Sequence, residues 1–225
     1  MKLVIVAGAG CGHGFYRDVV KELKDIYTDV ELILPLGEDY EEIINSVYDK
    51  LKIIKENFVL LGHCMGGMVS MDIVCNKVKL NNMRKLILLN TYFDFTFMDK
   101  QFIKDSGESV DSYSEDAIKR VKDGLLDGAI ASKQLDIILT RDLTDSIKNI
   151  DFKTLIIGSD NDPLFPVEKL SNLRDNIKFS KLHILKKARH LAFITHIDEV
   201  KRTIVEWNLS TDDYEYGKSE ELLRI

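Results

Sequence analysis

Short apolar runs alternate with longer amphipathic stretches along most of the chain. The runs that predict β-strands are 3–7, 31–34, 58–61, 85–89, 154–157 and 181–185. Most are continuous rather than alternating in polarity, which indicates strands buried on both faces, as in a parallel sheet covered by helices. We therefore expect an α/β fold with a mostly parallel central sheet and helices on both faces.

Helical periodicity connects these runs, with apolar residues recurring every three to four positions. The segments that predict helices around the sheet are 15–27, 39–56, 68–75 and 197–207. Residues 92–150 break the alternation, because they are rich in charge and offer only two helical stretches, 114–131 and 135–147. The pattern predicts one core domain from residues 1–91 and 151–210, a helical cap inserted at 92–150, and an acidic appendage at 211–225.

Composition narrows the class of protein. The 225 residues suffice for one sizeable core, and a net charge of −6 with no basic stripe argues against nucleic acid as a partner. No apolar run has the ~20 residues that cross a bilayer, so no membrane association is predicted. Residues 1–11 predict a buried strand rather than a secretory leader. The three cysteines form neither an even disulfide framework nor a zinc spacing, which favours a reducing cytoplasm and no metal.

The most informative motif is Gly62-His63-Cys64-Met65-Gly66, which lies between the apolar run 58–61 and the helical stretch 68–75. A strand, a tight turn with a nucleophile between small residues, and a helix are typical of a nucleophile elbow. The central residue here is cysteine instead of the more usual serine. The start of a helix and a neighbouring imidazolium both favour the thiolate form of a cysteine. Cys64 is therefore the candidate nucleophile.

An acid and a base follow in loops after later strands. Asp160 and Asp162 come directly after the run 154–157, in Gly158-Ser159-Asp160-Asn161-Asp162-Pro163. On the residues alone, Asp160 and Asp162 are both candidates for the catalytic acid. His190 follows the run 181–185 and precedes a helix, which makes it the candidate base. The remaining histidines fit worse; they are His13, His63, His183 and His196.

These motifs resemble the α/β-hydrolase family over nearly the whole chain. The resemblance implies a triad ordered nucleophile, acid, histidine, here Cys64, Asp162 and His190. Asp162 is favoured because its distance to Pro166 matches the family pattern Gly-x-x-Asp-x-x-x-Pro, and Asp160 is the alternative acid. It also implies an oxyanion hole made by two backbone N–H groups. One would belong to Met65, directly after the nucleophile, and the other to Ala9 in the glycine-rich loop after the first strand, with Gly10 as the alternative. That loop lacks the full motifs for nucleotide phosphates, so no cofactor is predicted.

The resemblance together with cysteine indicates acyl transfer through a thioester intermediate. The first loop and the elbow are similar to those of type II thioesterases, and the elbow is also similar to that of polyhydroxyalkanoate synthases. The predicted function is hydrolysis of an ester or thioester. The alternatives are a cysteine acyltransferase with an amine, thiol or hydroxyl acceptor, and a non-catalytic ligand-binding homologue. The segment 92–150 holds twelve acidic and eight basic residues, a net charge of −4, which favours a small neutral or cationic acyl substrate.

The other two cysteines are predicted to have structural roles. Cys11 lies in the first glycine-rich loop, which is expected across the pocket from Cys64, and Cys75 lies on the helix after the elbow. We expect both to pack as small apolar side chains. A reversible Cys11–Cys64 disulfide is the alternative for Cys11.

Overall fold

The sheet forms the centre of the molecule in the computed structural model, which describes residues 1–77, 80–106 and 113–210. The predicted acidic appendage, 211–225, lies outside the described residues. All strands are parallel, in the order β2-β1-β3-β4-β5-β6, so the predicted fold class is confirmed. The strands are β1 (Lys2–Val6), β2 (Val30–Ile33), β3 (Phe58–His63), β4 (Met83–Leu89), β5 (Lys153–Ser159) and β6 (Ser180–Leu185).

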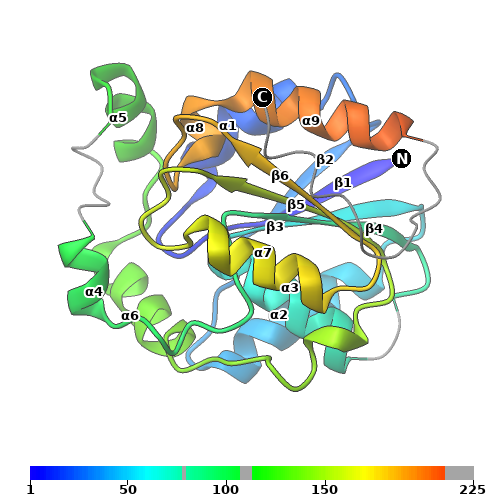
Figure 1. The fold of residues 1–225 in the computed structure, drawn as a ribbon, viewed down its shortest axis with the longest axis horizontal. Helices are drawn as coiled ribbons and strands as arrows, with labels where there is room; N and C mark the ends of the chain where they lie inside the picture. Colours follow the sequence, from blue (N-terminus) through cyan, green and yellow to red (C-terminus); the bar gives the residue numbers. More distant parts are fainter. Residues whose placement is uncertain (78–79, 107–112, 211–225) are drawn as a thin grey trace.

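Helices cover both faces of this sheet, as the continuous apolar strands require (Figure 1). One face carries α1 (His13–Leu23), α8 (Ala192–Thr195) and α9 (Ile197–Leu209). The other carries α2 (Tyr40–Lys52), α3 (Met65–Asn76) and α7 (Val167–Asn176). The two apolar layers explain why β3 is buried along its whole length.

Helix α2 shows how local sequence sets these elements. Asp39 caps its first turn by accepting a hydrogen bond from the Glu42 N–H at 2.9 Å. Acidic residues lie in the first turn and lysines in the last, which suits the helix dipole. One face is buried against the sheet through Ile43, Val47 and Leu51, among others. Capping and periodicity therefore agree on the start of the helix, whereas the helix ends at Lys52, four residues before the predicted end.

The segment between β4 and β5 contains α4 (Lys100–Asp105), α5 (Glu115–Lys122), α6 (Gly128–Ile138) and the 3₁₀ turn η2 (Ile147–Asn149). The predicted helix 114–131 is wrong, because the chain is not helical at 123–127, where residues 124–126 pair with the loop after β1. The predicted helix 135–147 is also wrong. Helix α6 ends at Ile138, and residues 141–143 pair with 93–95.

Parallel strands place all their carboxyl ends at one edge, the left side of the sheet in Figure 1, where α4, α5 and α6 also lie. The loops that carry the sequence-predicted site residues follow β1, β3, β5 and β6 at this edge. The chain adds β2 on one side of β1 and all later strands on the other side. Ligands of open α/β sheets bind at such a switch point, which here lies between the carboxyl ends of β1 and β3. Cys64 lies at this point.

Candidate active site

The turn that carries Cys64 has a strained backbone. Cys64 has φ 51° and ψ −119°, outside the conformations that side chains ordinarily favour. A Cβ atom on Gly66 would lie 2.1 Å from the Val6 carbonyl oxygen, so only glycine fits where the turn crosses β1. The Cys64 carbonyl accepts hydrogen bonds from the Gly67 N–H at 2.9 Å and the Thr91 hydroxyl at 2.7 Å. These contacts hold the thiol at the end of β3, at the start of α3.

His190 and Asp162 meet beside this turn. Nδ1 of His190 lies 2.9 Å from Oδ2 of Asp162, and both residues are buried. An ionised carboxylate only accepts hydrogen bonds, so Nδ1 carries the proton and Nε2 is left free for proton transfer. Asp160, two residues away, is exposed. The geometry therefore favours Asp162 over Asp160 as the partner of the histidine.

The Asp162 carboxylate accepts four hydrogen bonds. Its Oδ1 receives the backbone N–H groups of Leu164 and Phe165 at 2.9 and 3.2 Å, and its Oδ2 receives His190 and the Asn90 amide, the latter at 2.8 Å. Asn90 also donates to the Ser159 hydroxyl at 3.0 Å. Sequence reasoning missed Asn90. Its place directly after the apolar run 85–89, at the same sheet edge as the other site residues, was the available signal.

The electrostatics of the pair favour an ionised carboxylate and a protonated imidazole. Burial opposes the charge of Asp162, but the His190 charge and the hydrogen bonds from His190 and Asn90 lower the pKa of Asp162 below its ordinary value. Burial likewise opposes protonation of His190, but the charges of Asp162 and Cys64 raise the pKa of His190 well above its ordinary range. His190 is thus suited to hold a proton beside Cys64.

The other histidines lack this environment. His63 is buried beside the site, where burial and the charge of His190 lower its pKa to about 3. Its Nδ1 is hydrogen-bonded to the Tyr16 hydroxyl at 2.7 Å, in a structural role. His13 is exposed, His183 lies within β6, and His196 precedes α9. Of the histidines, only His190 lines the cavity that contains Cys64.

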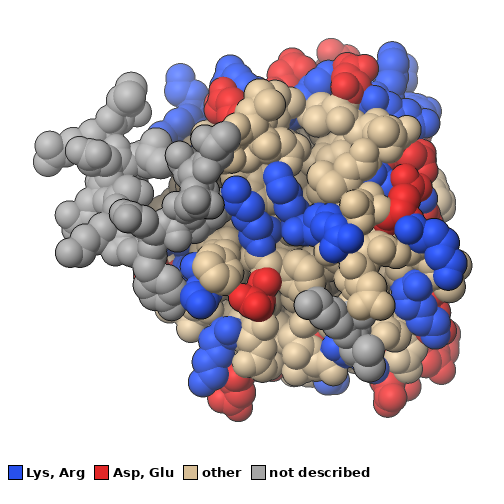
Figure 2. Space-filling view, turned by 90° about the vertical axis from the view of Figure 1, so that its right-hand side faces the viewer, with Lys and Arg blue, Asp and Glu red and all other residues tan. Residues whose placement is uncertain are grey.

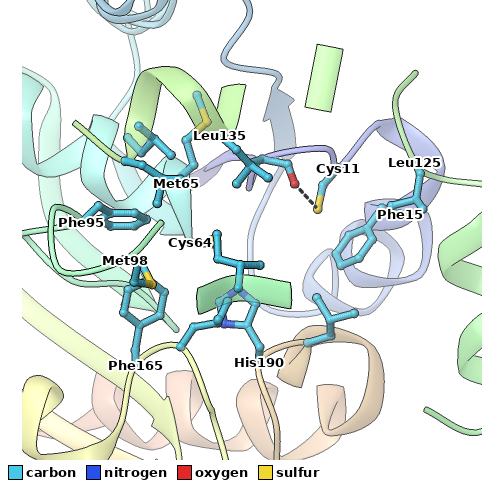
Figure 3. A pocket seen from close by; sticks show the side chains of 16 residues that line it. Cys11, Phe15, Cys64, Met65, Phe95, Met98, Leu125, Leu135, Phe165 and His190 are labelled. Atoms are coloured by element: carbon cyan, nitrogen blue, oxygen red, sulfur yellow. Dashed lines mark hydrogen bonds between the residues drawn. The ribbon is translucent and has the colours of Figure 1, made fainter. Parts of the chain in front are cut away.

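That cavity has a volume of about 220 Å³ and contains Cys64 in its wall. In Figure 3, Cys64 lies between two groups of side chains, with Phe95, Met98 and Phe165 on one side and Cys11, Phe15 and Leu125 on the other. No Asp, Glu, Lys or Arg lines it among the described residues. The remaining lining residues are Ala9, Met65, Ile103, Leu135, Ile138, Leu139, Leu164, His190 and Leu191.

The two predicted oxyanion donors belong to residues that line this cavity. Met65 is the first residue of α3, and Ala9 lies in the loop after β1. No hydrogen bond joins either N–H to another described residue. The alternative donor, the Gly10 N–H, is already bonded to the Gln134 side chain at 2.8 Å. The arrangement therefore favours Ala9 over Gly10.

The three cysteines are free thiols. Cys11 is buried and its Sγ lies 3.5 Å from the Ala9 carbonyl oxygen (Figure 3). Burial first, and then the charge of Cys64, raise the pKa of the Cys11 thiol. Cys11 therefore stays protonated and packs in the pocket wall. Its redox link to Cys64 stays a prediction.

Many of the Lys and Arg side chains gather on one face of the molecule. Figure 2 shows Lys and Arg grouped on the face at the amino ends of the strands, the right side of Figure 1. Lys85 and Lys153 are register partners near the start of β4 and β5 there. Within the described segments, no helix has the length and apolarity to cross a membrane, and no group of three or more potential metal ligands is found. The cavity at the opposite edge is thus the main candidate site.

The hydrogen-bonded pair of Asp162 and His190 also predicts how the free energy of unfolding depends on pH. Folding raises the pKa of His190. Its contribution to the free energy of unfolding is therefore full below about pH 6.5 and is lost as pH rises through the pKa that His190 has in the folded protein. Folding lowers the pKa of Asp162. Its contribution to the free energy of unfolding is therefore present above about pH 4 and is lost as pH falls through the pKa that Asp162 has in the folded protein. Asp162→Asn should reduce or reverse the fall in the free energy of unfolding above pH 6.5. Urea unfolding of both proteins across pH checks this, and identical pH profiles would contradict it.

Comparisons with known proteins agree with this architecture. No protein-family model matches the sequence, and no curated protein matches it significantly. Solved structures do match. A lipase-esterase related protein from Clostridium acetobutylicum has a TM-score of 0.77 at 21% identity, over 92% of this chain and 93% of that one. A thermophilic esterase from Thermogutta terrifontis has a TM-score of 0.72 at 17% identity, over 92% and 89%.

A third match is the enol-lactonase from Burkholderia xenovorans LB400, with a TM-score of 0.71 at 16% identity, over 93% of this chain and 91% of that one. At these identities the likeness concerns the fold alone. The strand order, the elbow turn and these neighbours together define the chain as a protein with the α/β-hydrolase fold.

Proposed function

We propose that the protein is an acyl hydrolase that acts on a small ester or thioester through Cys64, His190 and Asp162. One observation carries the proposal: a cysteine on a strained turn lines the same apolar cavity as a histidine that is hydrogen-bonded to a buried aspartate. Nucleophile, base and orienting acid are the parts that covalent acyl transfer requires.

In the first half of the reaction, the Cys64 thiolate attacks the acyl carbonyl carbon and forms a C–S bond. The carbonyl electrons move onto oxygen, and the N–H groups of Met65 and Ala9 stabilise that negative charge. When the intermediate collapses, the bond to the leaving group breaks and Nε2 of His190 protonates the departing oxygen or sulfur. The product is an acyl-Cys64 thioester.

In the second half, water replaces the leaving group. His190, now neutral, takes a proton from the water as it attacks the thioester carbonyl. Collapse of this intermediate breaks the C–S bond, which releases the carboxylic acid and restores the thiolate beside a protonated His190. Asp162 keeps the imidazole oriented throughout and does not take its proton.

The cavity favours an uncharged acyl group. Its volume of about 220 Å³ exceeds the ~150 Å³ of an engineered protein cavity that holds benzene, so a short aliphatic or single-ring acyl group fits. Phe95 and Phe165, on one side of Cys64, are 2% and 0% exposed. On the other side Cys11 and Phe15 are also buried, but Leu125 is 45% exposed and opens that side toward solvent. We assign the buried side to the acyl group and the side next to Leu125 to the leaving group. No carboxylate lines the cavity among the described residues, which disfavours a cationic substrate.

Met98→Trp tests this assignment, because it adds bulk to the buried side. We expect the preferred acyl chain to shorten, with kcat/KM falling about 10- to 200-fold for the longest accepted chain and little for acetyl esters. Initial rates on 4-nitrophenyl esters of increasing chain length measure it. Leu125→Trp is the matched control and should alter the dependence on the leaving group instead. An unchanged chain-length profile in Met98→Trp would contradict the assignment.

A product assay distinguishes the proposed hydrolase from a transferase. The protein is incubated with acyl esters and acyl thioesters, with and without primary amine, thiol or alcohol acceptors, and the products are identified by mass spectrometry. We expect free acid as the main product in every case. Acyl transfer to an acceptor in preference to water would establish the acyltransferase alternative, and no turnover of any substrate would remove the proposed function.

A further inference from the structure

The inserted segment 92–150 contacts the loop that carries the second oxyanion donor. That loop, Ala7–Gly12, is called the β1–α1 loop below. From α6, the Gln134 side chain reaches into it, and its Oε1 accepts a hydrogen bond from the Gly10 N–H at 2.8 Å. Its Nε2 donates to the Pro35 carbonyl at 3.0 Å. Gln134 is only 3% exposed, so its amide is committed to these two backbone groups.

Backbone contacts add to this connection. The Gly12 N–H donates to the Gly124 carbonyl at 2.7 Å, and the Leu126 N–H donates to the Gly10 carbonyl at 2.8 Å. Cys11 and Leu125 form an antiparallel bridge between the two segments. A Cβ atom on Gly124 would lie 1.9 Å from the Phe15 nitrogen, so only glycine allows this approach. The insertion therefore holds the β1–α1 loop from outside the sheet.

The backbone N–H groups of the β1–α1 loop differ in whether they have a hydrogen-bond partner. The Gly8 N–H donates to the Tyr16 hydroxyl at 2.8 Å, the Cys11 N–H to the Gly8 carbonyl at 3.2 Å, and the Gly10 and Gly12 N–H groups to the insertion. The Ala9 N–H alone in this series has no partner among the described residues. The peptide groups before and after the Gly8–Ala9 peptide are thus both fixed, by Tyr16 and Gln134 respectively.

We propose that Gln134 is a positioning residue of the oxyanion hole: by fixing the Gly10 N–H it orients the Ala9 N–H toward the developing oxyanion. The inference rests on the proposed function. It assigns the inserted segment a second role, because the segment then completes the catalytic centre as well as forming part of the pocket wall. Gly10 has φ +71°, a left-handed conformation that leaves this part of the loop dependent on its hydrogen bonds.

The test compares two reactions of Cys64 in Gln134→Met. Methionine has a similar length and shape but no acceptor for the Gly10 N–H. Acylation by a 4-nitrophenyl ester forms an oxyanion, whereas alkylation by iodoacetamide displaces iodide from carbon and forms none. We expect kcat for the ester to fall about 10- to 100-fold with KM within about twofold, below the 10²- to 10³-fold loss of a whole oxyanion donor. The alkylation rate at Cys64, followed on its peptide by mass spectrometry, should stay within about twofold.

Two further variants make the result decisive. Gln101→Met places the same substitution on α4 of the insertion, and it should change neither reaction. Gln101 is exposed, and among the described residues its side chain bonds only Asp105. Gln134→Asn keeps the amide but is too short to reach Gly10, so it should reproduce the selective loss if Gln134→Met does not fold. Unchanged acylation, or equal losses in acylation and alkylation, would overturn the proposal. A wild-type protein that is alkylated at Cys64 but accepts no acyl group would instead overturn the proposed function, and this inference with it.

Discussion

Cys64→Ala should lower kcat/KM for ester hydrolysis by about 10⁴- to 10⁶-fold, to a residual rate about 10³- to 10⁴-fold above that of the uncatalysed reaction. The reason is that the acyl group is then left without a nucleophile, while the cavity and both oxyanion donors remain. Substrate binding should change little, because the thiol is one of many groups that line the cavity. Steady-state kinetics on the best ester, together with binding of the product acid, measure the two effects separately.

Cys75→Ala is the matched control, since Cys75 is also a free thiol and lies on the helix that Cys64 precedes. It should keep wild-type kcat/KM within about twofold. Hydrolysis that survives in Cys64→Ala would contradict the assigned nucleophile. Equal loss in both variants would point to damage to α3 rather than to chemistry.

The second large effect is expected from Asp162→Asn, which should lower kcat by about 10³- to 10⁴-fold, as the equivalent change does in serine triads. The amide cannot hold the His190 imidazole in the required tautomer. It also removes the charge that contributes most to raising the pKa of His190. Rates measured across pH should show both effects, as a lower maximum and an altered acid–base profile.

Asp160→Asn provides the control, because it makes the same change two residues away on an exposed side chain. We expect its kcat to stay within about twofold of wild type. A larger loss in Asp160→Asn than in Asp162→Asn would contradict the assignment of the acid. The sequence alone left these two aspartates open, and their different burial separates them.

The sheet could be predicted because its signal is local. Each buried strand is a short continuous apolar run, and the runs at 58–61 and 154–157 correspond to β3 and β5 within two residues at each end. The start of helix α2 could also be predicted, since its capping residue, its charged residues and its apolar face all lie within or next to the helix. The patterns did not give the order of the strands, which the structure supplies.

The insertion was predicted less well because long-range contacts determine it. Gly124 and the capping residue Asp127 are local signals for the break between α5 and α6. Nothing in the residues 123–127, however, shows that they pair with a loop more than one hundred positions earlier. The partners of Gln134, which is one of several polar residues in α6, are likewise distant in sequence: they are Gly10 and Pro35. Contacts of this kind depend on the assembled fold, so periodicity and propensity cannot reveal them.

The candidate site could be predicted from the sequence in part. Cys64, Asp162 and His190 could be located because each follows its own strand, and parallel strands bring such loops together. The hydrogen bond between His190 and Asp162 required the structure. Asn90 was missed although it also follows a strand, because an amide is not one of the groups that a triad motif specifies.

The central claim is that Cys64 carries the acyl group, and intact mass spectrometry tests it most directly. The protein is mixed with a slowly hydrolysed acyl ester and the reaction is quenched in acid within seconds. The intact mass is then measured, and the protein is digested to locate the modification. The account predicts a mass increase of one acyl group on the peptide that contains Cys64, which disappears in Cys64→Ala and persists in Cys75→Ala. Turnover with no adduct, or an adduct that remains in Cys64→Ala, would contradict it.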